Sequence, residues 1–234
     1  MRTAFITGGS GGIGSAIVKK LKKCGYNVVI GYFSNEEAAF SLAKEVGAEA
    51  AWINVTDTDS VKRAFDFARK KFGKIGVLIN CAGIALKQAV ITDVKEKDFD
   101  RVFLTNVKGV FNCCKEVVPD MLYLGYGDII NVSSVWGEDG ASCEVVYSAS
   151  KGAVNSFTVS LAKELEFSDI KVNAVAPSFV KTKMNEHLTK EDEERFLFDY
   201  GLSALTTSEE VADEVIRLIE GEESGQIVRV EHKI

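Results

Sequence analysis

The stretch TGGSGGIG, residues 7–14, decides the fold because it joins an apolar run to the start of a helical pattern. Residues 3–7 predict a buried strand, and the residues from Gly12 onward predict a helix. The five glycines in residues 8–14 let the backbone approach a bound group, and a helix start offers free N–H groups and a positive dipole end. A tight turn alone needs only one or two glycines. The stretch therefore indicates a pyrophosphate-binding turn.

Outward from this turn, short apolar runs alternate with helical patterns along the whole chain. We expect strands near residues 3–7, 27–32, 50–53, 75–80, 128–132, 171–176 and 226–230, and helices beginning near Gly12, Asn35, Asp57, Lys97, Val146 and Ser208. This alternation predicts an α/β fold, a Rossmann-type doubly wound parallel sheet of about seven strands with helices on both faces. With no linker or repeat, residues 1–234 form a single domain. Residues 177–189 have no clear pattern, and a mobile lid is expected there.

Composition and charge exclude several classes of function. The chain has 234 residues, 46% of them apolar and 26% charged, and a net charge of −6, which is typical of a globular protein and argues against nucleic-acid or anionic-membrane partners. No signal peptide or membrane span is recognised, so a cytoplasmic location is expected. Five cysteines without a Cys-x-x-Cys pair, and two distant histidines, indicate no metal site.

The chemistry centres on Tyr147 and Lys151, four residues apart in VVYSASKGAV, with Ser134 thirteen positions before the tyrosine. Residues four apart share one face of a helix. A nearby ammonium favours the phenolate, so we expect Lys151 to lower the pKa of Tyr147 and to make it a proton donor or acceptor near neutral pH. One Tyr-x-x-x-Lys pair by itself is weak evidence.

Five motifs in order strengthen the case, and together they resemble those of short-chain dehydrogenases/reductases over nearly the whole chain. The motifs are TGxxxGxG at residues 7–14, NCAG at residues 80–83, Asn106 in LTNVKG, Ser134 in INVSSVWG, and YSASK at residues 147–151. The resemblance implies hydride transfer between a nicotinamide and a carbonyl or carbinol carbon. It implies that Tyr147 protonates the forming alkoxide and that Ser134 hydrogen-bonds the same oxygen. Lys151 would hold the nicotinamide ribose, and Asn106 would support a proton-relaying water.

The turn and the resemblance together give the candidate cofactor-binding residues. These are Gly8, Ser10, Gly12, Ile13, Gly14, Tyr32, Phe33, Ser34, Asn35, Asn54, Val55, Asn80, Ala82, Gly83, Tyr147, Lys151, Pro177 and Thr182. An NAD enzyme usually has an acid at the end of the second strand, where this chain has Tyr32 and then Phe33. Ser34 and Asn35 could hold a 2′-phosphate at a helix start, so NADP(H) is favoured over NAD(H). The resemblance places Asn54 at the adenine and Thr182 at the nicotinamide carboxamide.

The favoured function is a ketone reductase that resembles bacterial 3-oxoacyl-acyl-carrier-protein reductases. The loop SVWGEDGASCEVVY, residues 134–147, is similar instead to that of reductases of the 5-aminopentanone group on elongation factor P. The candidate substrate-loop residues are Trp136, Glu138, Asp139 and Glu144. The three acids could attract a cationic ketone, or they could form an ordinary solvated loop.

Two other functions stay open. One is a non-catalytic dinucleotide-binding sensor or scaffold; the other is an epimerase or dehydratase, which would need a GxxGxxG loop and a longer carboxyl-terminal domain. The resemblance also implies a homotetramer built on the helices around Asn106 and Tyr147. The carboxyl end departs from the family pattern, since Glu231-His232 replaces the usual Gly-Gly.

Overall fold

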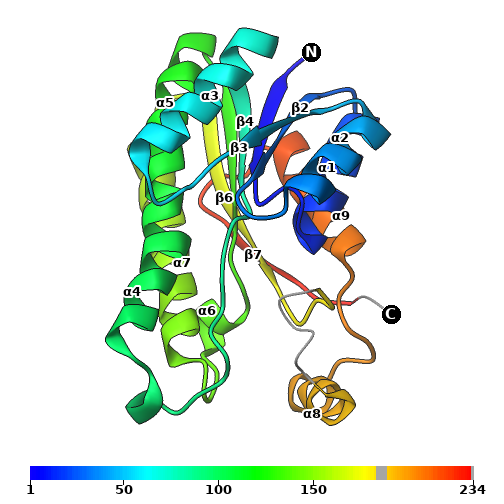
Figure 1. Cartoon of the computed structure of the whole chain (residues 1–234), viewed down its shortest axis with the longest axis vertical. Helices are drawn as coiled ribbons and strands as arrows, with labels where there is room; N and C mark the ends of the chain where they lie inside the picture. The colour runs from blue at the N-terminus through cyan, green and yellow to red at the C-terminus, as the bar shows by residue number, and fades with distance from the viewer. Residues whose placement is uncertain (183–188, 233–234) are drawn as a thin grey trace.

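A computed structural model describes residues 1–182 and 189–232, and in that part of the chain seven strands form one parallel sheet (Figure 1). The strands are β1 Thr3–Thr7, β2 Asn27–Tyr32, β3 Glu49–Trp52, β4 Ile75–Asn80, β5 Gly127–Val132, β6 Ile170–Pro177 and β7 Ile227–Val230. Their order is β3-β2-β1-β4-β5-β6-β7. The order reverses between β1 and β4, and ligands of open α/β sheets bind at such a switch point, outside the carboxyl ends of the strands.

Helices cover both faces of the sheet. They are α1 Gly12–Lys23, α2 Glu36–Val46, α3 Thr58–Phe72, α4 Glu96–Phe103, α5 Gly109–Leu124, α6 Trp136–Asp139, α7 Val145–Glu164, α8 Lys190–Tyr200 and α9 Ser208–Glu220, with a 3₁₀ turn η1 Ile91–Asp93 and a π-helical turn η2 Leu104–Lys108. In Figure 1, α1, α2 and α9 lie on one side of the sheet, and α3, α5 and α7 lie on the other.

Strand alternation produces two cores, one on each face of the sheet. Ala4 and Ile6 of β1 pack into the core beneath α1, α2 and α9, whereas Phe5 packs into the core beneath α3, α5 and α7. Successive side chains of a strand point to opposite faces, so apolar residues at consecutive positions are buried on both sides. The α/β fold and the Rossmann-type sheet predicted from the sequence are confirmed.

The elements near the carboxyl edge of the sheet differ from the prediction. The helices α6 and α8 were not expected, and both lie at the lower end of the molecule in Figure 1. The helix expected near Lys97 continues from α4 through η2 into α5. The π-helical turn η2 is one wide helical turn between them, so the helix is not broken. Part of the expected lid, residues 183–188, lies outside the described residues. None of the helices that the structure describes is long and apolar enough to cross a bilayer.

Candidate active site

The glycine turn and the end of β4 are joined at the carboxyl edge of the sheet. The Thr7 hydroxyl accepts hydrogen bonds of 3.1 Å from the backbone N–H groups of both Cys81 and Ala82. Gly8 has φ +64, and a Cβ placed on it would lie 2.9 Å from Ala82 Cα. Only glycine fits this left-handed position against a neighbouring backbone. The loops that follow β1 and β4 are therefore held together by these contacts at the carboxyl edge of the sheet.

The start of α1 fits a pyrophosphate. A Cβ on Gly14 would lie 2.3 Å from the Gly8 carbonyl oxygen, and a Cβ on Gly12 would lie 2.7 Å from Thr182 Cγ2. The first turn of α1 has no side-chain cap and no acidic residue, so the N–H groups of Gly12, Ile13 and Gly14 can bind an anion. Ser10 lies in the same turn. Thr182 lies against Gly12, and its place at the nicotinamide carboxamide stays a prediction.

The end of β2 carries the residues expected at the adenosine ribose. The Tyr32 hydroxyl donates to the Glu36 carboxylate at 3.1 Å, and Asn35 caps α2 by accepting from the Ala38 N–H at 3.4 Å. Phe33 is 61% exposed, and the Trp52 indole N–H donates to its carbonyl oxygen at 3.0 Å. The sequence analysis missed Glu36 and Trp52, although Glu36 could have been found as an acid in the first turn of the helix after β2.

Asn54 has a local structural partner that the sequence analysis did not anticipate. Its Oδ1 accepts from the backbone N–H of Thr56 at 3.1 Å and from the Thr56 hydroxyl at 2.9 Å. Two donors fill the two lone pairs of an amide oxygen, so the expected acceptance from an adenine amine has no free lone pair at Oδ1. The neighbouring Val55 is buried, and its carbonyl oxygen accepts from Asn112 Nδ2 at 2.8 Å.

Asn106 fixes the loop that follows β4. It is buried within η2, its Oδ1 accepts from the Ile84 N–H at 2.9 Å, and its Nδ2 donates to the Ile84 carbonyl at 2.9 Å and to Ser150 Oγ at 3.0 Å. A Cβ on Gly83 would lie 3.4 Å from Asn106 Oδ1 and 3.6 Å from Lys151 Nζ. The structure therefore brings Asn106, Gly83 and Lys151 together, as the motifs predicted.

Asn80 belongs to a buried polar chain that links β4, β5 and α7. Its Nδ2 donates to Asn131 Oδ1 at 2.9 Å, and Asn131 Nδ2 donates to the Thr158 hydroxyl at 2.9 Å. The buried Oδ1 of Asn80 has no hydrogen-bond partner within the described residues. Because unpaired buried acceptors are costly, Asn80 is suited to receive a donor from a bound group or water.

Lys151 is buried on α7, and its Nζ donates to the Val132 carbonyl oxygen at 2.7 Å. Burial lowers the pKa of Lys151 to about 8, because desolvation disfavours the charged form. Its Nζ lies 5.6 Å from the centroid of the Tyr147 ring. The two residues therefore share one face of α7, as predicted.

The expected effect on the tyrosine was wrong. Burial raises the pKa of Tyr147 above its ordinary value, and the charge of Glu144 raises it further, whereas the hydrogen bond with Ser134 acts in the opposite direction. Desolvation exceeds the influence of a lysine whose ammonium is turned toward Val132. Tyr147 is thus a protonated phenol at neutral pH. The Oγ of the nearby Ser134 accepts from the Trp136 N–H at 3.2 Å.

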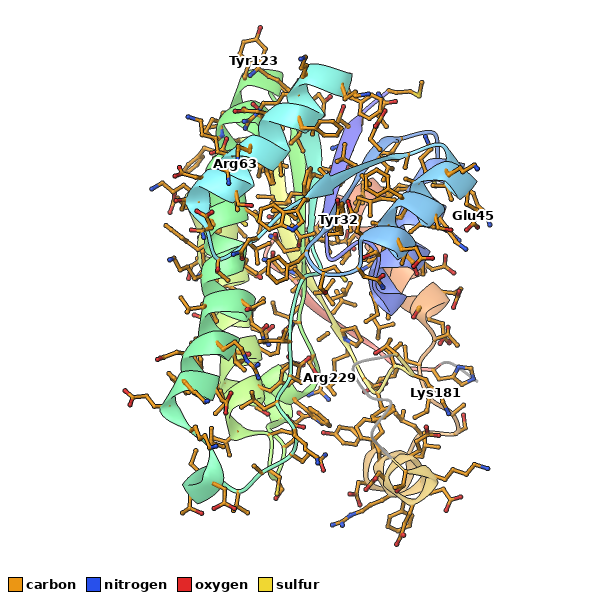
Figure 2. The ribbon with its side chains drawn as sticks, viewed as in Figure 1. Tyr32, Glu45, Arg63, Tyr123, Lys181 and Arg229 are labelled. Carbon is orange, nitrogen blue, oxygen red and sulfur yellow. The ribbon has the colours of Figure 1, made fainter. Side chains whose placement is uncertain are left out.

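The acids of the substrate loop have two different environments. Glu138 Oε2 lies 2.8 Å from Arg229 Nε, and Asp139 also pairs with Arg229. Arg229 extends from β7 toward the end of the molecule that carries α6 and α8, opposite the end labelled Tyr123 (Figure 2). These two acids are therefore paired with an arginine rather than free, and its single positive charge balances one of their two negative charges. Glu144 has no such partner among the described residues.

An aromatic cluster that the sequence analysis missed joins α6 to α8. The Trp136 ring lies edge-on to Tyr147 at 6.1 Å and to Phe196 at 6.3 Å between centroids. Phe196 stacks on Tyr200 at 4.4 Å and contacts Phe179 at 5.4 Å. The cluster gives Tyr147 an apolar wall. Pro177 ends β6 on the same side, and its carbonyl accepts from the Val135 N–H at 3.1 Å.

These features together define a dinucleotide-dependent oxidoreductase. A family model for short chain dehydrogenase matches residues 2–193. The chain is 38% identical over 238 residues to a 3-oxoacyl-[acyl-carrier-protein] reductase of Thermotoga maritima, an alignment that covers 98% of this chain and 96% of that protein. The chain therefore belongs to the short-chain dehydrogenase family, as its motifs predicted, and it is an NAD(P)-dependent oxidoreductase acting on carbonyl or hydroxyl groups.

Solved structures agree with this assignment. A 3-ketoacyl-(acyl-carrier-protein) reductase from Brucella melitensis complexed with NADH superposes with a TM-score of 0.93 at 28% identity, covering 98% of this chain and 96% of that one. ElxO with NADP bound superposes with a TM-score of 0.89 at 29% identity, with the same coverage. One of these neighbours holds NADH and the other NADP.

Proposed function

We propose that this protein is an NADP(H)-dependent ketone reductase. One observation carries the proposal: Tyr147 shares a helix face with Lys151 and lies near Ser134, which acts to lower its pKa, at the edge of the sheet that carries the uncapped glycine turn of α1. The bound nicotinamide would supply or accept the hydride. Glycine-turn N–H groups would hold its pyrophosphate, and Asn80 and Thr182 would position its nicotinamide half.

The chain's own residues account for the proton. A ketone oxygen placed beside Ser134 and Tyr147 would accept a hydrogen bond from each hydroxyl, and the phenol would transfer its proton as negative charge develops on that oxygen. Because its pKa is raised, Tyr147 carries this proton at neutral pH. This state suits reduction of a ketone, in which the enzyme must donate a proton. Asn106 supports the site by fixing Ile84 beside Lys151.

The preference for NADP(H) rests on the end of β2. Tyr32 and Phe33 provide no carboxylate to hydrogen-bond a ribose 2′-hydroxyl, and Ser34 lies next to the amino-terminal end of α2. Glu36, which could oppose a 2′-phosphate, is hydrogen-bonded to Tyr32. Titration with NADPH and NADH tests this proposal, and Phe33→Asp should shift the preference toward NADH by repulsion. Equal or tighter NADH binding by the unmodified protein would overturn it.

The relatives suggest a 3-oxoacyl thioester as the substrate, and the loop resemblance suggests an aminoketone on a protein, such as the 5-aminopentanone group of elongation factor P. The direct experiment follows NADPH oxidation with an acetoacetyl thioester and with simple ketones. Reduction of any of them, lost in Tyr147→Phe, supports ketone reduction. Tight NADPH binding without turnover of any carbonyl compound would support the alternative, a dinucleotide-binding sensor or scaffold.

We also propose a homotetramer located in the cytoplasm. Exposed apolar residues on the helices around the site, Phe99 of α4, Phe111 of α5 and Val145 of α7, are suited to burial between subunits. Sedimentation of the purified protein at several concentrations tests the assembly, and a monomer at micromolar concentration would exclude it. Cell fractionation tests the location.

A further inference from the structure

Glu144 has a fixed place at the start of the helix that carries the catalytic tyrosine. Its N–H donates to the Ala141 carbonyl at 3.2 Å, and its carbonyl accepts from the Ser148 N–H at 2.9 Å. It precedes α7 as the N-terminal cap residue, yet its side chain makes no capping hydrogen bond. Tyr147 follows three positions later, so the two side chains lie one helical turn apart.

The Glu144 side chain is largely buried and has no partner among the described residues. It is 7% exposed, and within residues 1–182 and 189–232 no ion pair or side-chain hydrogen bond involves its carboxylate. Burial raises the pKa of Glu144 to about 7, with no opposing contribution from a cation or a donor. A buried carboxyl group without a partner is costly, and the cost falls when a cation or a donor arrives.

The surrounding charged groups leave this carboxyl available. On α7, Lys151 Nζ is bonded to the Val132 carbonyl, and Tyr147 is neutral near pH 7. On α6, Glu138 and Asp139 are bonded to Arg229. The loop after β4 contacts this region through the Ala89 N–H, which donates to the Cys143 carbonyl at 3.1 Å, and Lys87 of that loop is exposed. None of the described cationic side chains pairs with Glu144.

We propose that Glu144 is a specificity-determining residue that binds an ammonium group on the ketone substrate. This inference rests on the proposed ketone reduction at Tyr147, and it identifies the substrate class as an aminoketone whose nitrogen reaches one helical turn from the reacting oxygen. The ion pair forms when the Glu144 carboxylate faces the ammonium, and any proton held by the carboxyl group passes to the buffer. No covalent bond changes in this recognition.

The test uses a matched pair of substrates, 4-aminobutan-2-one and pentan-2-one, in which an ammonium replaces a methyl group. The ratio of their kcat/KM values is measured for the unmodified protein, Glu144→Gln, Glu144→Asp and the control Glu138→Gln, each checked for folding by thermal melting. We expect Glu144→Gln to lower the aminoketone-to-ketone ratio by about tenfold or more. Glu144→Asp, which keeps the charge, should retain part of the preference, and Glu138→Gln should leave the ratio unchanged.

Calorimetry of 4-aminobutan-2-one binding at pH 7, in buffers of different ionisation enthalpy, provides a readout independent of turnover. The unmodified protein should release protons on binding, and Glu144→Gln should release none. A ratio and a proton release that are the same in Glu144→Gln and in the unmodified protein would overturn the role of Glu144 while leaving ketone reduction intact. If neither these ketones nor an acetoacetyl thioester is reduced, the proposed function fails, and the calorimetric comparison still decides whether Glu144 binds an ammonium.

Discussion

The two halves of the proposed site lie at the same edge of the sheet, but one is formed by backbone and the other by side chains. The cofactor half consists of backbone: a glycine turn, the uncapped start of α1 and the N–H groups tied to Thr7. The substrate half consists of side chains from α6, α7 and α8, held by an aromatic cluster and by ion pairs to Arg229. A backbone site restricts which residues fit, whereas a side-chain site can change its specificity through single substitutions.

The largest effect should come from the residue where the two halves meet. We expect Tyr147→Phe to lower the rate of hydride transfer by about a hundredfold or more, because it removes the general acid. Stopped-flow absorbance of NADPH measures the rate, and a parallel titration should give nearly unchanged cofactor affinity. The control is Tyr126→Phe, because Tyr126 directly precedes β5 and lies at the opposite edge of the sheet. A Tyr147→Phe enzyme with the wild-type rate would remove this residue from the mechanism.

In the backbone half, the addition of a single methyl group at Gly14 should lower both stability and cofactor affinity. Gly14→Ala places a Cβ that would lie 2.3 Å from the Gly8 oxygen, so the turn must shift. We expect stability to fall by about 1–3 kcal/mol and NADPH affinity to fall about tenfold or more, measured by urea unfolding and by fluorescence titration. The matched variant Gly11→Ala, whose Cβ would lie 3.3 Å from the same oxygen, should have a much smaller effect. Equal effects in the two variants would contradict the close-approach argument.

In the side-chain half, the largely buried Glu144 should make the free energy of unfolding depend on pH. The pKa of Glu144 rises from 4.5 in the unfolded chain to about 7 in the folded protein, so the folded state binds the proton more tightly. Its stabilising contribution is complete below pH 4.5 and is lost as the pH rises through 7. Relative to Glu144→Gln, the unmodified protein should lose on the order of 1–3 kcal/mol over this range.

Urea unfolding at a series of pH values measures that difference. Glu222→Gln, which alters an exposed carboxylate beyond α9, is the control and should show no such pH-dependent difference from the unmodified protein. Parallel stability profiles for Glu144→Gln and the unmodified protein would mean that the Glu144 carboxyl is solvated. Glu144 would then not differ in environment from the partly exposed Glu138 and Asp139.

The smallest effect should come from the outer ion pairs of α6. Arg229→Gln removes the partner of Glu138 and Asp139, but the arginine is 41% exposed, and exposed pairs contribute little because water and salt screen them. We expect a stability loss below about 1 kcal/mol by urea unfolding, with a rate of hydride transfer close to that of the unmodified protein. A collapse of the rate would show that α6 depends on Arg229 to place Ser134.

The sequence predicted the glycine turn and the buried strands beside it well because their signals are local. A glycine pattern directly after a strand predicts a tight turn at the start of a helix. A continuous apolar run such as β4 predicts a strand that is buried on both faces. The order of the motifs also brought Asn106, Ser134, Tyr147 and Lys151 to one edge. Such features depend on neighbours in the chain, so they can be recognised without a structure.

The substrate half was less predictable because its contacts are distant in sequence. Arg229 and Glu138 are 91 residues apart, and Phe196 meets Trp136 only after α8 folds back. The raised pKa of Tyr147 depends on burial, which the spacing of Tyr147 and Lys151 does not reveal. The short helix α6 has too few residues to show a period. The hydrogen bonds from Thr56 to Asn54 were likewise not expected, because the family resemblance assigns that position to the adenine.

The π-helical turn that holds Asn106 sets a limit on the length of the chain at this point. Deleting one residue between Leu104 and Lys108 would let the turn close into an ordinary α-helix. The helices α4 and α5 would stay nearly in phase, because the wide turn already absorbs one extra residue, but the side chain of Asn106 would no longer project from that turn. Asn106 would then leave Ile84 and Ser150. Substitutions on the outer face of this helix can be tolerated, but a single-codon deletion here should inactivate the enzyme even though it improves the helix.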